Sequence, residues 1–241
     1  MNKVKIFAGP CALESEEQIN EVADVIKSLG LSWIRCGVYK PRISPHSFQG
    51  LGDSGLEILK DIDLDIITEV TEPNQIEKVM DTCSAIQIGS RNMYNYALLK
   101  EIGKRTGDFP ILFKRGMSAT ISEYLSASEY ISSAGNKNIM LCERGIRTFE
   151  DATRFTLDIS AVPIIHKQTQ YPICVDVSHA AGRSDLVPSM AKAAIASGAD
   201  ALMIEVHPNP MKALCDGPQQ LNLEQFKVLI DELRTFDKEL I

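Results

Sequence analysis

The stretch Ile173-Cys-Val-Asp-Val-Ser-His-Ala-Ala-Gly-Arg-Ser-Asp185 shows the structural unit that recurs along the whole chain. It opens as a short apolar run that ends in a histidine, His179, and continues through a glycine and a charged loop into a segment with helical spacing. A buried strand followed by a polar connection and a helix is the repeating unit of a parallel α/β sheet. We therefore expect one βα unit here, with functional groups at the end of its strand.

The same unit recurs along the chain. Near-continuous apolar runs are typical of parallel strands buried on both faces, and longer segments with helical spacing separate them. Eight such strands alternating with about eight helices in 241 residues predict a closed (β/α)8 barrel, a TIM barrel of the α/β class. A doubly wound open sheet is the alternative, but it usually has fewer strands. The predicted strands are residues 4–8, 33–39, 65–70, 85–88, 111–114, 139–142, 173–177 and 201–206.

Composition narrows the class of protein. A hydrophobic content of 44% and a charged content of 24% are enough for a full core, and the net charge of -7 argues against a general nucleic-acid-binding surface. We see no apolar run long enough to cross a bilayer and no signal peptide. The six cysteines are spread singly, without a C-x-x-C pair. These features predict a cytoplasmic protein with reduced thiols.

Four side chains that can bind a metal ion fall at neighbouring positions of the predicted barrel. Cys11 ends the first strand, His179 follows the seventh, Glu205 ends the eighth and Asp216 lies in the loop after it. Strands seven, eight and one are adjacent once the barrel closes, and groups at the C-terminal ends of barrel strands face the active site. A thiolate, an imidazole and two carboxylates tolerate several divalent ions, such as Mn, Fe, Co or Zn, and suit a Lewis-acid role. We therefore expect a metal site.

Basic residues gather at the same predicted rim. Seven of them follow one strand after another: Arg35, Lys40, Arg42, Arg91, Lys114, Arg115 and Arg144. Convergent Arg and Lys side chains are what a small polyanion needs, since guanidinium groups bind phosphate and carboxylate at two points. We expect one or two of the seven to pair with rim carboxylates such as Glu69, Glu143 and Asp176, and the others to bind a ligand.

Eight motifs, in order over nearly the whole chain, carry a family resemblance. They are Gly9-Pro10-Cys11, Lys40-Pro-Arg42, Ser47-Phe-Gln-Gly-Leu-Gly52, Gln87-Ile-Gly-Ser-Arg-Asn-Met93, Lys114-Arg-Gly-Met-Ser118, Cys142-Glu-Arg-Gly-Ile-Arg147, Ser178-His-Ala-Ala-Gly-Arg183 and Met203-Ile-Glu-Val-His207. With them the chain resembles 3-deoxy-D-arabino-heptulosonate 7-phosphate (DAHP) synthases, in particular the shorter type I-beta branch. That branch is related to the 3-deoxy-D-manno-octulosonate 8-phosphate synthases.

The resemblance implies a (β/α)8 barrel that condenses phosphoenolpyruvate with erythrose 4-phosphate and water to give DAHP and phosphate, the first step of the shikimate pathway. It implies a divalent metal ion bound by the four side chains above, and a homotetramer or homodimer. The implied phosphoenolpyruvate ligands are Arg35, Lys40, Arg91, Lys114, Arg115 and Arg144. Arg42, with its neighbours Pro41 and Ser44, would hold the aldose phosphate.

The expected chemistry leaves the proton donor open. A divalent metal ion near Cys11 and His179 would polarise the aldehyde, and the cationic pocket would align both substrates. Lys40 or a metal-bound water would then protonate the nascent alkoxide.

Two positions depart from the heptulosonate pattern. Ile43 stands where a threonine is usual, and Val177 stands where a proline is usual. The sequence around Val177 approaches the octulosonate habit, whereas the Lys-Pro-Arg motif at Lys40 favours the heptulosonate product. The alternatives are the same condensation with arabinose 5-phosphate and, more remotely, a barrel that binds a phosphosugar without turnover.

The domain organisation predicted from the sequence is simple. We see no linker, repeat or low-complexity stretch, and the last helix is expected near residues 222–239. Residues 1–241 are therefore expected to form a single barrel without a separate regulatory domain. On this view, feedback control by aromatic amino acids within the chain is not expected.

Overall fold

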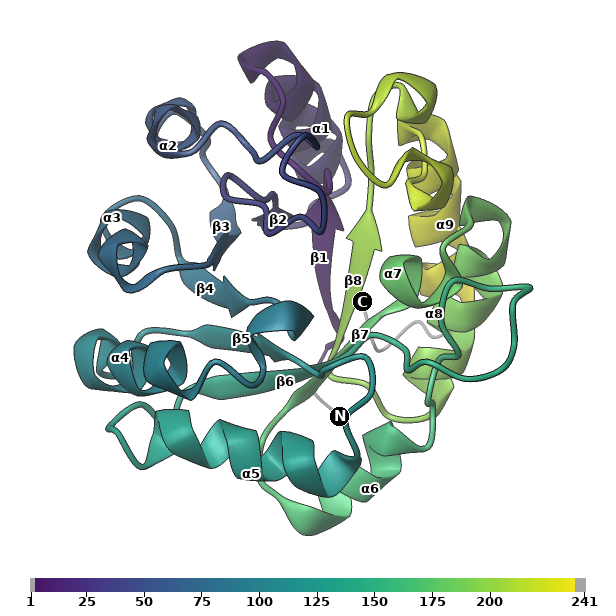
Figure 1. The fold of residues 1–241 in the computed structure, drawn as a ribbon. Helices are drawn as coiled ribbons and strands as arrows, with labels where there is room; N and C mark the ends of the chain where they lie inside the picture. The colour runs from purple at the N-terminus through teal and green to yellow at the C-terminus, as the bar shows by residue number, and fades with distance from the viewer. Residues whose placement is uncertain (1–2, 237–241) are drawn as a thin grey trace.

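Eight parallel strands form a closed barrel in the order β1 to β8 in the computed structural model, which describes residues 3–236 (Figure 1). The (β/α)8 architecture predicted from the sequence is confirmed. The strands are β1 (Lys5–Gly9), β2 (Trp33–Arg35), β3 (Asp65–Val70), β4 (Ala85–Ile88), β5 (Ile111–Lys114), β6 (Ile139–Glu143), β7 (Ile173–Asp176) and β8 (Ala201–Glu205).

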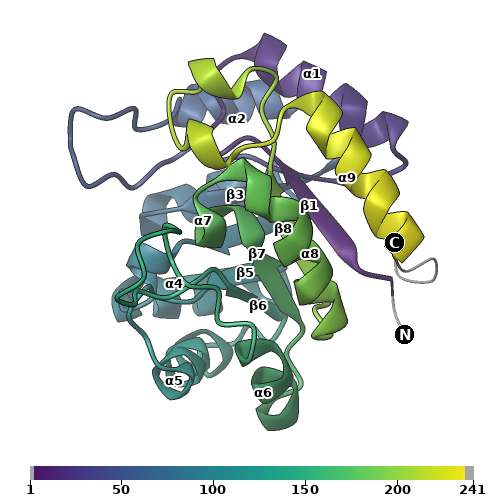
Figure 2. The same ribbon diagram turned by 90° about the vertical axis from the view of Figure 1, so that its right-hand side faces the viewer.

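Helices surround the strands on the outside (Figures 1 and 2). They are α1 (Glu16–Ser28), α2 (Asp53–Leu59), α3 (Ile76–Met80), α4 (Tyr96–Thr106), α5 (Ile121–Ser132), α6 (Ala161–Gln168), α7 (Val177–Ala181), α8 (Val187–Ala196) and α9 (Leu223–Phe236). Among the described residues, no helix combines the length and apolar character needed to span a membrane.

The core has two layers because successive strand residues face opposite sides. One cluster of eight buried side chains fills the barrel interior, and a larger cluster lies between the strands and the helices. The inner cluster consists of Phe7, Ile67, Ala85, Leu112, Cys142, Cys174, Ala201 and Met203. The barrel is therefore a packed core rather than a pore, and the only places left for polar chemistry are its ends.

Pairing of β1 with β8 closes the barrel. The register runs from Lys5 opposite Ala201 to Gly9 opposite Glu205. Gly9 has φ +146, and a side chain there would overlap the backbone oxygen of Arg35. Glycine is therefore required for β1 to end beside β2 and for the chain to turn toward the rim.

The second strand is shorter than predicted from the sequence. The apolar run of residues 33–39 continues past Arg35, but the strand ends there. The Cys36 N–H still donates to the Ile67 carbonyl of β3, but beyond it the backbone bonds leave the sheet: Gly37 accepts from Leu13, and the Val38 N–H donates to the Thr68 hydroxyl. The buried segment therefore continues beyond the residue at which the strand ends.

Other predicted boundaries differ by one or a few residues. Val177 begins α7 instead of ending β7, because the Asp176 side chain accepts a hydrogen bond from the His179 N–H and caps the helix at once. The last helix runs over Leu223–Phe236, and the rest of its predicted range lies outside the described residues. These changes move no strand to another place in the barrel.

A buried tyrosine supports the β5–β6 side of the barrel. The Tyr124 hydroxyl, from α5, accepts a hydrogen bond of 2.7 Å from the Cys142 N–H and donates to the Phe113 carbonyl. It thereby satisfies one backbone group of each strand at a fully buried position.

Tyr124→Phe should therefore lower the free energy of unfolding by about 1–3 kcal/mol, the cost of leaving a buried donor without a partner. Urea denaturation followed by circular dichroism measures it. Tyr130→Phe on the same helix is the control, because its half-buried ring stacks on Tyr96 outside the barrel. Equal stability of the two variants would contradict this role of the hydroxyl.

Candidate active site

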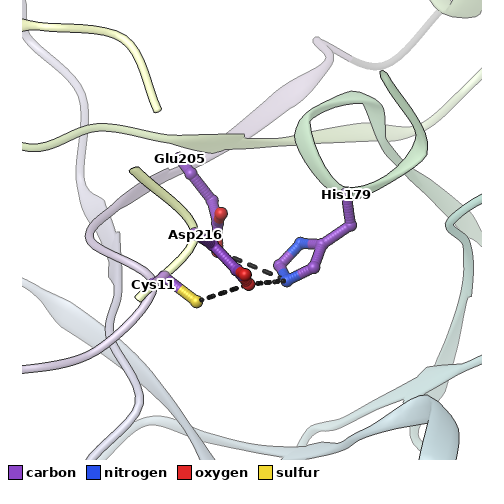
Figure 3. A group of neighbouring side chains, drawn as sticks. All are labelled: Cys11, His179, Glu205 and Asp216. Atoms are coloured by element: carbon purple, nitrogen blue, oxygen red, sulfur yellow. Dashed lines mark hydrogen bonds and ion pairs between the residues drawn. The ribbon is translucent and has the colours of Figure 1, made fainter. Parts of the chain in front are cut away.

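The four metal-competent side chains predicted from the sequence meet at the C-terminal end of the barrel (Figure 3). One ligand atom from each of Cys11, His179, Glu205 and Asp216 lies within 4.8 Å of all the others. The Cys11 Sγ is 3.2 Å from Asp216 Oδ2, and His179 Nε2 lies 3.5 Å from Glu205 Oε1 and 3.6 Å from Asp216 Oδ2. We call these four residues the metal-competent cluster.

Asp176 orients the histidine of the cluster. Its Oδ1 accepts from the backbone N–H of His179, and its Oδ2 lies 2.8 Å from His179 Nδ1. Nε2 is left to face the other three groups. Burial lowers the pKa of His179 to about 4, so the imidazole is neutral at neutral pH and has a lone pair to offer.

Glu205 is fully buried and stays ionised through two partners. Arg35 Nη1 lies 2.6 Å from its Oε1, and Gln219 Nε2 donates to its Oε2 at 2.6 Å. Burial opposes ionisation, but the positive charge of Arg35 keeps the pKa of this carboxyl below its usual value.

Asp216, the fourth residue of the cluster, lies in the loop after β8 and has a strained backbone conformation. Asp216 has φ 53, the only positive φ of a residue other than glycine in the described chain. In the same loop, Gln220 accepts from the Cys11 N–H at 3.2 Å and donates to the Cys215 carbonyl at 3.0 Å. The loop therefore fixes the backbone that carries two of the four groups.

The donor set fits a divalent metal ion. It combines one sulfur, one imidazole nitrogen and two carboxylates, all converging on one small region. A contact with Cys215, together with burial, raises the pKa of the Cys11 thiol, so a metal ion has to displace a proton from this sulfur. Lys40 Nζ lies 3.2 Å from that sulfur and can stabilise the thiolate.

A polar cleft opens beside the cluster. It is lined by Arg35, Lys40, Pro41, Arg42, Glu69, Gln87, Gly89, Ser90, Arg91, Lys114, Met117, Arg144, Arg154, His179 and Asp216. Arg144 lies over the Phe155 ring at 3.9 Å, and its buried Nε has no hydrogen-bond partner. Burial lowers the pKa of Arg144 to about 10, which leaves the group cationic at neutral pH. An unsatisfied buried cation at the cleft suits an anionic ligand.

More of the basic residues are paired than the sequence led us to expect. Arg35 pairs with Glu205, Lys114 with Asp176, and Arg115 with both Glu143 and Asp158 at 2.7 Å each, which makes three rather than one or two. The reason is that buried carboxylates need a cation close by.

Two residues predicted to bind substrate lie outside the cleft lining. Arg115 is turned to its carboxylates and to the Ala119 carbonyl, and Ser44 is exposed on the loop after β2. The neighbouring Ile43 side chain is 85% exposed. The other predicted ligands line the cleft.

Three residues of the site were not found from the sequence. Gln219 and Gln220 hold Glu205 and Cys11, and Arg154 lines the cleft. All three lie well beyond a strand end, where no periodic pattern marks them. An Arg in a polar loop was the only available signal, and such residues are usually solvated.

A closed parallel barrel with a metal-competent cluster and a cationic cleft at its C-terminal end defines a barrel enzyme of the kind that acts on small anions. The family model described as the DAHP synthetase I family matches residues 2–239. The chain belongs to this family.

Two relatives and one solved structure are similar to this chain over nearly its whole length. A phospho-2-dehydro-3-deoxyheptonate aldolase of Thermotoga maritima is 50% identical over 233 residues, covering 95% of this chain and 68% of that protein. The crystal structure of a phospho-2-dehydro-3-deoxyheptonate aldolase (DAHP synthase) of this organism has a TM-score of 0.94 at 48% identity, covering 98% of this chain and 70% of the other. A 2-dehydro-3-deoxyphosphooctonate aldolase of Desulfosudis oleivorans is 32% identical over 250 residues, covering 95% of this chain and 88% of that protein.

The Arg35–Glu205 pair generates a stability prediction. Arg35→Met should lower the free energy of unfolding by about 3–5 kcal/mol, because it leaves Glu205 buried without its cation. Urea denaturation of metal-free protein measures the loss. Lys60→Met, which removes an exposed pair with Glu57, should change little. A similar small change for both variants would show that Glu205 does not depend on Arg35.

Proposed function

We propose that this protein condenses phosphoenolpyruvate with erythrose 4-phosphate and water, giving DAHP and phosphate at the entry to the shikimate pathway. The observation that carries the proposal is the metal-competent cluster opening onto a cleft with unpaired cations. Membership of the DAHP synthetase I family supports it, as does the 50% identity to a relative named for this product.

The cleft can hold the enol phosphate donor at both of its anionic groups. Arg91, Lys114 and Arg144 lie in the same lining. Two-point contacts from guanidinium groups fix the position of the donor, so that its methylene carbon faces the second substrate. Arg42, in the loop after β2, is placed to take the phosphate of the aldose.

The cluster would supply the electrophilic half of the reaction. Cys11, His179, Glu205 and Asp216 would hold a divalent ion, which as a Lewis acid polarises the aldehyde. The donor methylene carbon then bonds to the aldehyde carbon, and the other enol carbon takes up water before phosphate leaves. Lys40 Nζ, 2.9 Å from the Cys11 carbonyl oxygen, can donate a proton to the new alkoxide.

Arabinose 5-phosphate is the second candidate for the aldose. The octonate relative at 32% identity and Val177 in place of a proline favour it, but the 50% identical relative outweighs both. We further propose that the enzyme works in the cytoplasm as a homotetramer or homodimer and that residues 1–241 act as one catalytic barrel.

Cys11→Ala should lose bound divalent metal and nearly all turnover while keeping the barrel fold, because it removes the only sulfur of the cluster. Metal content by mass spectrometry, phosphate release and circular dichroism test this together. Cys83→Ala, at a buried cysteine outside the cluster, is the matched control. Full activity of metal-free Cys11→Ala would refute the proposed metal site.

The enzyme should use erythrose 4-phosphate with higher catalytic efficiency than arabinose 5-phosphate. Ile43→Thr should leave both efficiencies nearly unchanged, because the Ile43 side chain is 85% exposed and lies outside the residues that line the cleft. Steady-state phosphate release with each aldose phosphate measures both effects. A clear preference for arabinose 5-phosphate would overturn the proposed product and leave the barrel and the metal site in place.

A further inference from the structure

Arg154 contacts two parts of the site from a distant loop. It lies between β6 and α6, and its Nη1 donates to Gln219 Oε1 at 2.8 Å. The same nitrogen lies 3.2 Å from Asp216 Oδ1, while the other oxygen of Asp216 faces Cys11 and His179. One guanidinium therefore holds one group of the cluster directly.

Gln219 extends this contact to a second group. Its side-chain oxygen accepts from Arg154 and its nitrogen donates to Glu205 Oε2 at 2.6 Å. Because an amide has one accepting and one donating end, the bond to Arg154 fixes which end faces Glu205. Arg154 thus orients the carboxylate of β8 through one intermediate.

The loop that carries Arg154 is itself locked to α7. The N–H groups of Arg154 and Phe155 donate to the carbonyls of Ala181 and Ala180, at 3.0 Å each. Gly182 permits this approach, since a side chain there would overlap the Cβ of Arg154. His179 directly precedes these two alanines. The loop therefore also restrains the backbone that carries the histidine of the cluster.

We infer that Arg154 is a positioning residue of the metal-competent cluster, holding Asp216 directly and Glu205 through Gln219 while its loop braces the helix of His179. Groups behind metal ligands set ligand orientation, and their loss typically weakens metal binding about 10- to 100-fold. The inference rests on the proposed metal site. The competing role is that Arg154, which lines the cleft, binds substrate.

The test uses Arg154→Met, Arg154→Lys and Arg105→Met in the full chain. Arg105 is a matched control, because its side chain is 38% exposed against 35% for Arg154 and also pairs with carboxylates, but it lies on α4. Co²⁺ is titrated into metal-free protein, and the thiolate-to-cobalt absorption band reports binding. Thermal unfolding of the metal-free proteins and the Michaelis constants of both substrates are measured alongside.

Arg154→Met should raise the Co²⁺ dissociation constant by about 10- to 100-fold, Arg154→Lys should recover part of the loss, and Arg105→Met should match the unmodified protein. Unchanged Co²⁺ affinity in Arg154→Met overturns the inference, whether the Michaelis constants rise, the protein only loses thermal stability, or nothing changes. If the unmodified protein shows no such absorption with Co²⁺, the proposed metal site itself is refuted. This outcome distinguishes failure of the metal site from failure of the role of Arg154.

Discussion

The pairing of β1 with β8 is the constraint on which the site depends. It closes the barrel and sets Gly9 opposite Glu205, so the loop with Cys11 and the end of β8 share one edge. Residues 205 positions apart in sequence are brought to hydrogen-bond distance this way, as the 3.2 Å contact between Cys11 and Asp216 shows. Without closure, the metal-competent cluster would be split between the two edges of an open sheet.

Charge balance decides what the closed rim can do. Buried carboxylates at the strand ends would be costly alone, and three of them pair with a cation: Glu205 with Arg35, Glu143 with Arg115 and Asp176 with Lys114. Arg144 has no such partner at its Nε. The same set of basic residues therefore divides into members that stabilise the fold and members that remain available for an anion.

The sequence allowed most of the barrel to be predicted, because parallel strands buried on both faces leave continuous apolar runs. It failed at residues 33–39, where burial continues after the ladder ends at Arg35. The sequence also predicted the four residues of the metal-competent cluster, because a residue that follows a barrel strand lies at the C-terminal end of the barrel. That these groups lie together is observed in the structure, whereas their binding of a metal ion stays a prediction.

Residue types and their spacing along the chain thus determined the fold class, the position of the cluster and the cationic character of the rim. Only the tertiary structure decided which cations are free, because pairing depends on side chains from different strands. Arg115 belongs to two carboxylates instead of the cleft, and Arg154 reaches Asp216 from a loop without any periodic pattern. Such contacts depend on loop paths and side-chain reach across the closed barrel, and local sequence encodes neither.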